Sequence, residues 1–266
     1  MTEPFSQWVV EDAFRNGRPA LEEVGVRFVG DVRPYALRKT RLLNGGHCAI
    51  GYLGTLAGHT RVAEAMPDRR IAGYVERLML DEIAPLLPPV ADDVDEYVAA
   101  LQRRFHDRAL GDQLARLCRN GSAKVPAHLV SCIREARMVG RPHALLTLAV
   151  AAWRVHLRDT HPDHLDDPGG ARLQGLAAAG GSDPRLLLAD TPTFGSLGEC
   201  PRFTRAVERD VRDLDEFGAA AVMATHRGLD RGGRSVSDPP GPASAGAREV
   251  TGQGVAPRAL DLRSSA

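Results

Sequence analysis

Apolar residues recur at the three- and four-residue spacing of an amphipathic helix along most of the chain after residue 30. This spacing predicts a first helix that begins behind Asp31 and runs through Leu53, with Pro34 in its first turn. The same pattern predicts further helices at 67–83, 94–105, 126–138, 142–157 and from Pro201 to Phe217. The 142–157 segment is apolar nearly all round, which is typical of a helix enclosed by its neighbours.

Strand signals are scarce, and only Val26–Val29, between two glycines, has the pattern of a strand. The predicted fold class is therefore mainly α, a multi-helix domain. Residues 229–266 are rich in Gly, Pro, Ser and Ala and have few large apolar groups, so we expect a disordered tail there. The expected organisation is an irregular N-terminal region over 1–30, a helical domain over 31–228 and the tail.

Charge and composition exclude several classes of protein. The 266 residues contain 34 Lys and Arg against 34 Asp and Glu, and the basic residues are dispersed, which argues against binding to nucleic acid or to a membrane surface. No apolar run approaches the roughly 18 residues of a membrane span, and the N-terminus is no signal peptide. We therefore expect a soluble cytoplasmic protein whose four scattered cysteines are reduced.

The stretch KTRLLNGGH contains the first candidate site, formed by Lys39, Asn44 and His47. On an ideal α-helix, at about 100° per residue, Asn44 lies about 140° and His47 about 80° from Lys39, so all three share one arc. Gly45 and Gly46 each cost about 1 kcal/mol in a helix interior, which suggests close approach of a ligand or another backbone.

These three residue types suit the interconversion of a secondary alcohol and a ketone. A lysine desolvated in a cleft has a lowered pKa and can remove the hydroxyl proton. An asparagine amide and a histidine N–H can donate hydrogen bonds to an oxygen that gains negative charge. The spacing alone favours a simpler interpretation, a solvated lysine, a helix-breaking asparagine and a histidine with a structural partner.

Two longer segments resemble the mannitol dehydrogenase family, the polyol-specific long-chain dehydrogenases. The first segment places the following residues on the family pattern: Trp8, Glu11, Asp12, Gly17, Arg18, Pro19, Lys39, Leu43, Asn44, His47, Tyr52, Leu53 and Gly54. The second, RLCRNGSAKVP, adds Arg116, Asn120, Gly121, Ser122, Lys124 and Pro126. The resemblance implies a metal-independent, NAD- or NADP-dependent enzyme.

The resemblance also assigns roles to individual residues. It implies that Lys39 is the acid–base residue, that Asn44 and His47 bind the reacting oxygen, and that Arg116 and Lys124 contact the polar chain of the substrate. Arg119 stands where relatives have a histidine near the substrate, and we include it in the substrate-binding set. Ala36 replaces a glutamate that relatives often carry three residues before the lysine.

Family members begin with a Rossmann-like nucleotide-binding domain, and the resemblance covers only the family's C-terminal domain. None of the glycine pairs at 45–46, 169–170, 179–180 and 232–233 follows a strand in a G-x-G-x-x-G context. Because this cradle is missing, we expect the cofactor to require a nucleotide-binding domain, which could be a separate chain. His161, His164, Asp166 and Asp167 contain metal-binding atoms, but their turn-forming neighbours favour a solvated loop.

The sequence supports two functional hypotheses. The first is an oxidoreductase domain that interconverts a sugar alcohol or hexonate with the ketose or keto-uronate, with a polyol, ketose or hexuronate as its partner. The second is a non-catalytic helical remnant, inert or able to bind a sugar acid or a protein partner.

Overall fold

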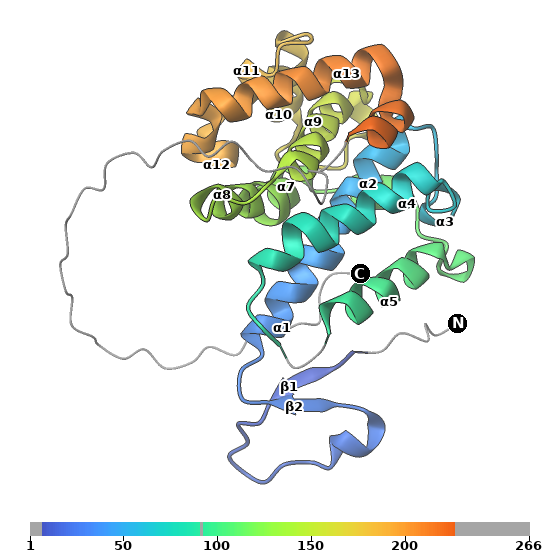
Figure 1. Ribbon diagram of the computed structural model, residues 1–266, viewed down its shortest axis with the longest axis vertical. Coiled ribbons are helices and arrows are strands. Elements are labelled where there is room, and N and C mark those ends of the chain that lie inside the picture. The colour runs from blue at the N-terminus through green and yellow to red at the C-terminus, as the bar shows by residue number, and fades with distance from the viewer. Residues whose placement is uncertain (1–6, 91–92, 227–266) are drawn as a thin grey trace, which may run out of the picture. The chain divides into compact units, whose positions relative to one another are not determined.

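The computed structural model describes residues 7–90 and 93–226, which form a mainly α-helical fold, as predicted (Figure 1). The only sheet in this part of the chain pairs β1 (Val9–Glu11) with β2 (Arg27–Val29) in parallel. The predicted strand at 26–29 is confirmed to within one residue, whereas β1 was not predicted. The expected tail at 229–266 lies outside the described residues.

The predicted first helix is confirmed, but its geometry is not uniform. It consists of α1 (Arg33–Arg38), the π-helical turn η2 (Lys39–Asn44) and α2 (Gly45–Leu56). The Asp31 carboxylate accepts the backbone N–H of Arg33 at 2.9 Å at its start. Because η2 closes i→i+5 hydrogen bonds, the angles calculated for an ideal α-helix are wrong between Lys39 and His47.

The middle of the chain consists of short helices joined end to end. The described elements are η1 (Leu21–Val24), α3 (Val62–Ala65), α4 (Arg69–Arg77), η3 (Leu78–Ile83), η4 (Ala84–Leu86), α5 (Val94–His106), η5 (Arg108–Leu110), α6 (Leu114–Cys118), α7 (Gly121–Val125), η6 (Pro126–Val130) and α8 (Ser131–Met138). Like η2, the turns η3 and η6 are π-helical. The helices predicted at 67–83, 94–105 and 126–138 are thus confirmed, two of them with a π turn inside.

The central helix is α9 (Ala144–Asp159), which is buried along most of its length, as its apolar sequence predicts. The remaining elements surround it: η7 (Pro162–His164), α10 (Gly170–Ala179), α11 (Arg185–Leu188), α12 (Thr191–Phe194), η8 (Gly195–Glu199) and α13 (Pro201–Thr225). Helices α13, α2 and α10 pack directly on α9, and Figure 1 shows α13 lying across it.

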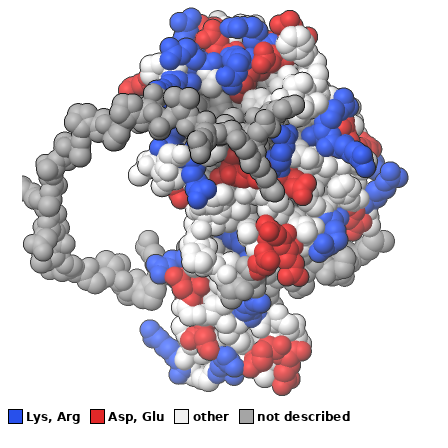
Figure 2. Space-filling view, in the orientation of Figure 1, with Lys and Arg blue, Asp and Glu red and all other residues white. Residues whose placement is uncertain are grey.

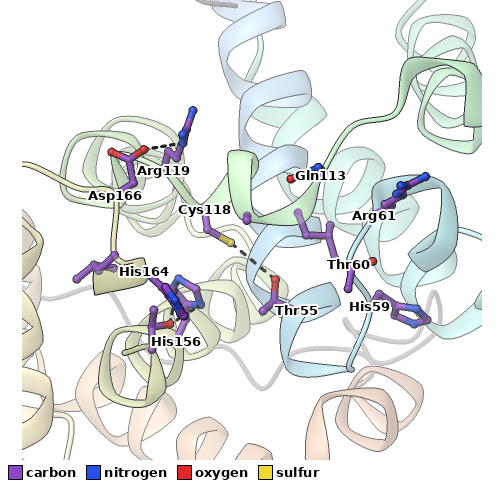
Figure 3. A pocket seen from close by; sticks show the side chains of 14 residues that line it. Thr55, His59, Thr60, Arg61, Gln113, Cys118, Arg119, His156, His164 and Asp166 are labelled. Carbon is purple, nitrogen blue, oxygen red and sulfur yellow. Dashed lines mark hydrogen bonds and ion pairs between the residues drawn. The ribbon is translucent and has the colours of Figure 1, made fainter. Parts of the chain in front are cut away.

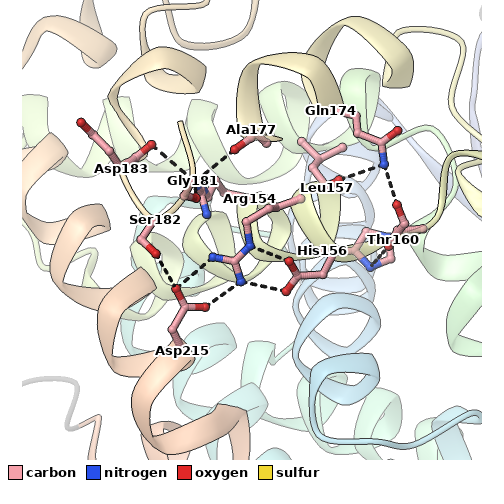
Figure 4. A network of polar contacts seen from close by, with 12 residues as sticks. Arg154, His156, Leu157, Thr160, Gln174, Ala177, Gly181, Ser182, Asp183 and Asp215 are labelled. Atoms are coloured by element: carbon pink, nitrogen blue, oxygen red, sulfur yellow. Dashed lines mark hydrogen bonds and ion pairs between the residues drawn. The ribbon is translucent and has the colours of Figure 1, made fainter. Parts of the chain in front are cut away.

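Two arginines of α9 hold neighbouring segments in place (Figure 4). The buried Arg154 guanidinium donates to the carbonyl oxygens of Ala177 at 3.2 Å and of Gly181, which satisfies acceptors at the end of α10. Arg158 bridges the carboxylates of Asp159 and Asp215 at 2.8 and 2.7 Å. This ion pair joins α9 to α13.

The predicted buried face of the last helix is correct except at its end. Phe203, Val207 and Val211 are buried, but Phe217 is 59% exposed. Gly218 has φ 76° and ψ 157°, so the helical path breaks directly after Phe217. The break ends the periodicity from which burial of Phe217 was inferred.

Acidic and basic side chains alternate over the face shown in Figure 2, in keeping with the dispersed charges of the sequence. Within the described ranges, no helix is both long and apolar enough to cross a membrane.

Candidate active site

The π turn that contains Lys39 packs against the two other π turns, η3 and η6. A Cβ atom placed on Gly45 would lie 3.4 Å from Ile83 Cδ1 and 3.7 Å from the His128 carbonyl oxygen. A Cβ on Gly46 would collide with the end of the Met79 side chain. The two glycines therefore permit close packing of neighbouring helical turns. The sequence suggested that these glycines allow close approach of either a ligand or another backbone, and the structure shows neighbouring parts of the protein in close contact with them.

Lys39 is exposed, whereas Asn44 and His47 are partly buried. Within the described residues, no neighbouring segment therefore desolvates the Lys39 side chain. Among residues 7–90 and 93–226, no hydrogen bond or ion pair holds the Lys39 ammonium group. Its amine is thus available to a substrate or to a covering domain.

His47 lies in a different environment from Lys39. Its ring packs against that of Phe105, with 5.1 Å between the centroids. Burial, with a further contribution from the Arg104 guanidinium, lowers the pKa of His47 to about 3. The imidazole is consequently neutral near pH 7 and has one N–H to donate.

The second sequence segment lies close to His47. Arg116 on α6 and Lys124 on α7 both lower the pKa of His47 electrostatically, while Asp112 raises it. Helix α6 reaches this position because α2 presents glycines to it: a Cβ on Gly51 would lie 3.1 Å from Leu117 Cβ. Arg116 and Lys124 are thus close enough to His47 to influence its protonation; that all three act on one substrate stays a prediction.

Arg116 and Lys124 differ in their own partners. The Arg116 guanidinium pairs with the Asp112 carboxylate and is 44% exposed at its side chain. Lys124 is partly buried, and its ammonium acts on the pKa values of Cys48 and His128 as well as on that of His47. The Lys124 ammonium thus lies close enough to residues of both α2 and η6 to act on them electrostatically.

Arg119 is separated from this group. Its guanidinium pairs with Asp166 at 2.7 Å and lines a different cavity, and it is not among the charges that act on His47. Helix α6 ends at Cys118, and Arg119 has an extended ψ of 148°, which turns the chain away. The structure gives no support to the grouping of Arg119 with Arg116.

Within residues 7–90 and 93–226, no three His, Cys, Asp or Glu side chains are grouped so that they could hold a metal ion. His164 ends the exposed η7 turn and His161 caps its start, and Asp167 accepts the Ser122 backbone N–H at 2.7 Å. The same part of the chain has two three-residue strands, and the connection from β2 to α1, Gly30-Asp31-Val32, has no G-x-G-x-x-G turn, so its residues do not fit a dinucleotide pyrophosphate.

The family model described as the mannitol dehydrogenase C-terminal domain matches residues 31–215, which include every residue of the candidate site. The chain belongs to the mannitol dehydrogenase family. A mannitol dehydrogenase of Saccharomyces cerevisiae is 39% identical over 238 residues, covering 87% of this chain and 45% of the relative. A mannitol 2-dehydrogenase of Aspergillus oryzae is 39% identical over 232 residues, with 84% and 46% covered.

Two solved structures share the fold of this member of the mannitol dehydrogenase family. The ternary complex of Pseudomonas fluorescens mannitol 2-dehydrogenase with NAD and D-mannitol has a TM-score of 0.75 at 39% identity, covering 84% of this chain and 46% of that one. A substrate-free D-sorbitol dehydrogenase has a TM-score of 0.74 at 26% identity, with 82% and 46% covered. The chain spans about half the length of the relatives that it matches.

The Asn-Gly-Ser part of this mannitol dehydrogenase family motif has a structural role here. Asn120 has φ 54°, the only positive φ of a non-glycine residue within the described ranges. A Cβ on Gly121 would lie 2.7 Å from both Trp153 Nε1 and Tyr52 Oη. Asp167 accepts from the backbone N–H of Ser122 and from its hydroxyl, which anchors the start of α7 beneath Lys124.

Gly121→Ala is expected to destabilise the protein by about 1–3 kcal/mol, because the added methyl group meets two rigid rings. Urea unfolding of the purified chain measures the change. Gly175→Ala, in α10 with open space around its Cβ position, is the matched control and is expected to be neutral or slightly stabilising. Equal effects of the two substitutions would contradict tight packing at Gly121.

His47 is expected to make the folded state sensitive to acid. Its folded pKa, about 3, lies below the ordinary value of 6.5, so the unfolded chain takes up a proton first as the pH falls. Above pH 6.5 this contribution to stability is complete; by about pH 4 it has fallen by up to about 3 kcal/mol. Urea unfolding of the native chain and of His47→Gln across this range isolates the contribution, with exposed His106→Gln as control.

Sequence reasoning missed three residues of this environment: Arg104, Phe105 and Asp112. Arg104 is the first of the charged groups that lower the pKa of His47, and Phe105 packs on its ring. Both lie on α5, whose pattern was interpreted only as a core-facing helix. No local spacing relates them to Lys39, since the packing of α5 beside α2 is a tertiary feature.

Proposed function

We propose that this chain supplies the catalytic and substrate-binding part of an NAD-linked polyol dehydrogenase that oxidises a secondary alcohol of a hexitol to the ketose and catalyses the reverse reduction. Family membership supports an oxidoreductase of this kind. The observation that carries the proposal is the grouping around His47: a neutral imidazole beside the cations of Arg116 and Lys124. The charged donors are close enough to act electrostatically on the residue predicted to hold the reacting oxygen.

In the proposed reaction Lys39 removes the hydroxyl proton through its amine. The Asn44 amide and the His47 N–H donate hydrogen bonds to the oxygen as it gains negative charge, which stabilises the transition state. Arg116 and Lys124 donate to hydroxyl groups farther along the substrate. A bound nicotinamide cofactor would supply the hydride acceptor.

The exposure of Lys39 leads us to propose that a nucleotide-binding domain completes the site. Desolvation by such a cover would lower the pKa of the amine toward the range useful in acid–base catalysis. The parallel pair β1–β2 supports the same idea, because parallel strands normally belong to larger sheets covered on both faces. Exposed Trp8 and Phe14 beside these strands offer apolar contact area.

Mannitol or a related neutral hexitol is the substrate that we propose, with fructose or a similar ketose as the product. The support is that relatives at 38–39% identity are named mannitol 2-dehydrogenases. A hexonate or hexuronate remains the alternative from the sequence. Arg119 was the residue that blurred this choice; it pairs with Asp166 and is not among the charges that act on His47, so we leave it out of the proposed substrate contacts.

A second candidate function is non-catalytic binding of a sugar or sugar acid. One observation favours it. The described residues contain no turn that fits a dinucleotide, whereas Arg116 and Lys124 are available as hydrogen-bond donors to a polar ligand. Under this hypothesis the chain binds a polyhydroxylated ligand but transfers no hydride.

Mixing the purified chain with the nucleotide-binding half of the Pseudomonas fluorescens relative tests the proposal. We expect fructose-dependent oxidation of NADH in the mixture and none with either part alone. Association of the two parts is measured separately by analytical ultracentrifugation. A stable complex without activity would favour the binding function, and NADH oxidation by the chain alone would contradict the need for a second domain.

A further inference from the structure

A cavity of about 470 Å³ lies between the C-terminal end of α2, helix α6 and the segment after α9 (Figure 3). None of Lys39, Asn44, His47, Arg116 and Lys124 lines it. Thr55 in its wall comes sixteen residues of helix after Lys39, a separation of more than about 20 Å. The cavity is therefore distinct from the candidate active site.

Its lining is rich in groups that bind anions. Arg61 and Arg119 contribute guanidinium groups, and His59, His156 and His164 contribute imidazoles. In Figure 3, Arg119 and His164 lie on one side of the cavity and Arg61 and His59 on the other. The Arg119 and Arg61 guanidinium groups thus lie at opposite edges of the cavity, where a small anion would have a cationic donor on each side.

The single carboxylate in the lining is Asp166, and its ion pair with Arg119 does not prevent an anion from binding there. The Arg119–Asp166 pair spans 2.7 Å, but its side chains are 56% and 62% exposed, and ion pairs this exposed are weak. Arg61 stands 3.9 Å from Glu64, with 60% of its side chain exposed. Both guanidinium groups can therefore turn to a ligand, for which the planar fork suits two oxygens at once.

Neutral donors are also available. Within the described ranges, neither the Gln113 amide nor the His59 ring has a hydrogen-bonding side-chain partner. The wall behind them is fixed: Asn120 N–H donates to the Asp166 carbonyl at 3.0 Å, and Thr160 Oγ1 lies 3.2 Å from His156 Nδ1. Fixed walls with uncommitted donors are typical of a preformed ligand site.

From this lining we propose that the cavity binds a small phosphate- or carboxylate-bearing metabolite, at a site separate from that of the hydride-transfer reaction. Two guanidinium groups provide the charge, and Gln113 with His59 provides hydrogen bonds to the ligand skeleton. Because α6 forms one wall of the cavity and also carries Arg116, an occupant would contact the helix that positions a substrate donor.

Titration of the purified full chain with inorganic phosphate tests the proposal, followed by a hexitol phosphate, a hexonate and a neutral hexitol at constant ionic strength. The readouts are the side-chain NMR resonances of His59 and His164 and the heat of binding. We expect phosphate-bearing and carboxylate-bearing ligands both to shift these resonances. Whichever of the hexitol phosphate and the hexonate binds more tightly identifies the class of the natural ligand. The neutral hexitol is expected to leave them unchanged.

Arg61→Gln and Arg119→Gln are each expected to raise the dissociation constant at least about tenfold. Arg103→Gln, an exposed arginine on α5 outside the cavity, is the matched control and is expected to bind normally. Three results would overturn the proposal: no shift with any anion, equal binding by Arg61→Gln, or equal shifts with the neutral hexitol. None of these results depends on hydride transfer, so failure here leaves the proposed reaction intact.

Discussion

Replacing Lys39 by alanine is expected to lower kcat of the assembled dehydrogenase about 100- to 10,000-fold, the usual contribution of a general acid–base residue. The substitution removes the amine that would accept the hydroxyl proton and leaves the oxygen-binding groups in place. Because Lys39 is exposed, the folded state should tolerate the change with little effect on stability. Steady-state oxidation of NADH with fructose measures the loss.

A chemical rescue distinguishes acid–base chemistry from a structural role. Small primary amines added to Lys39→Ala should restore part of the activity, with a pH profile that tracks the pKa of the added amine. Arg103→Ala, which removes an exposed cation elsewhere, serves as the control and should keep full activity. An unchanged kcat in Lys39→Ala would remove the lysine from the proposed reaction.

Glu82→Ala is expected to destabilise the chain by about 3–5 kcal/mol, the largest loss expected for a single side chain here. Glu82 is 1% exposed, and its carboxylate accepts the backbone N–H groups of Leu145 and Leu146 at 2.9 and 2.8 Å. These donors belong to the first turn of α9, where no partner exists within the helix. Removing the acceptor leaves two buried backbone N–H groups without a hydrogen-bond partner.

Urea unfolding at neutral pH measures the effect of Glu82→Ala. Glu82→Gln keeps one carbonyl acceptor and is expected to lose less stability. The difference between the two variants distinguishes the contribution of the hydrogen bonds from that of side-chain packing. Glu76→Ala, exposed on α4, is the matched control and should change stability by no more than about 0.5 kcal/mol. A loss below about 1 kcal/mol in Glu82→Ala would show that other groups, or water, satisfy the start of α9.

The helical periodicity predicted the helices well because the core faces repeat regularly. The 142–157 segment became α9, and the segment at 126–138 became η6 and α8. Periodicity failed where backbone geometry changes without a change of composition. The π turn at Lys39–Asn44 keeps the apolar spacing of a helix, and the break at Gly218 looks like any other glycine in the sequence.

The candidate site could be predicted in part because its two motifs are local in sequence. Arg116 and Lys124 lie near His47, which supports their grouping. Arg119 is not among the charges that act on His47, although it is only three residues from Arg116, because α6 ends between them; its role in substrate binding stays a prediction. Arg104 could not have been found, since it reaches His47 only through the packing of α5, and a single sequence contains no signal for that contact.

The three adjoining π turns have a consequence for how this kind of active site can diverge. A π turn arises when a helix holds one residue more than its α-helical hydrogen bonding accommodates. Deleting one residue between Lys39 and Asn44 would rotate the preceding segment by about 100° while His47 stayed in the core. A deletion of one codon would therefore redirect the amine proposed to accept the proton without moving the groups proposed to bind the oxygen. In evolution, chemistry and scaffold could then vary separately.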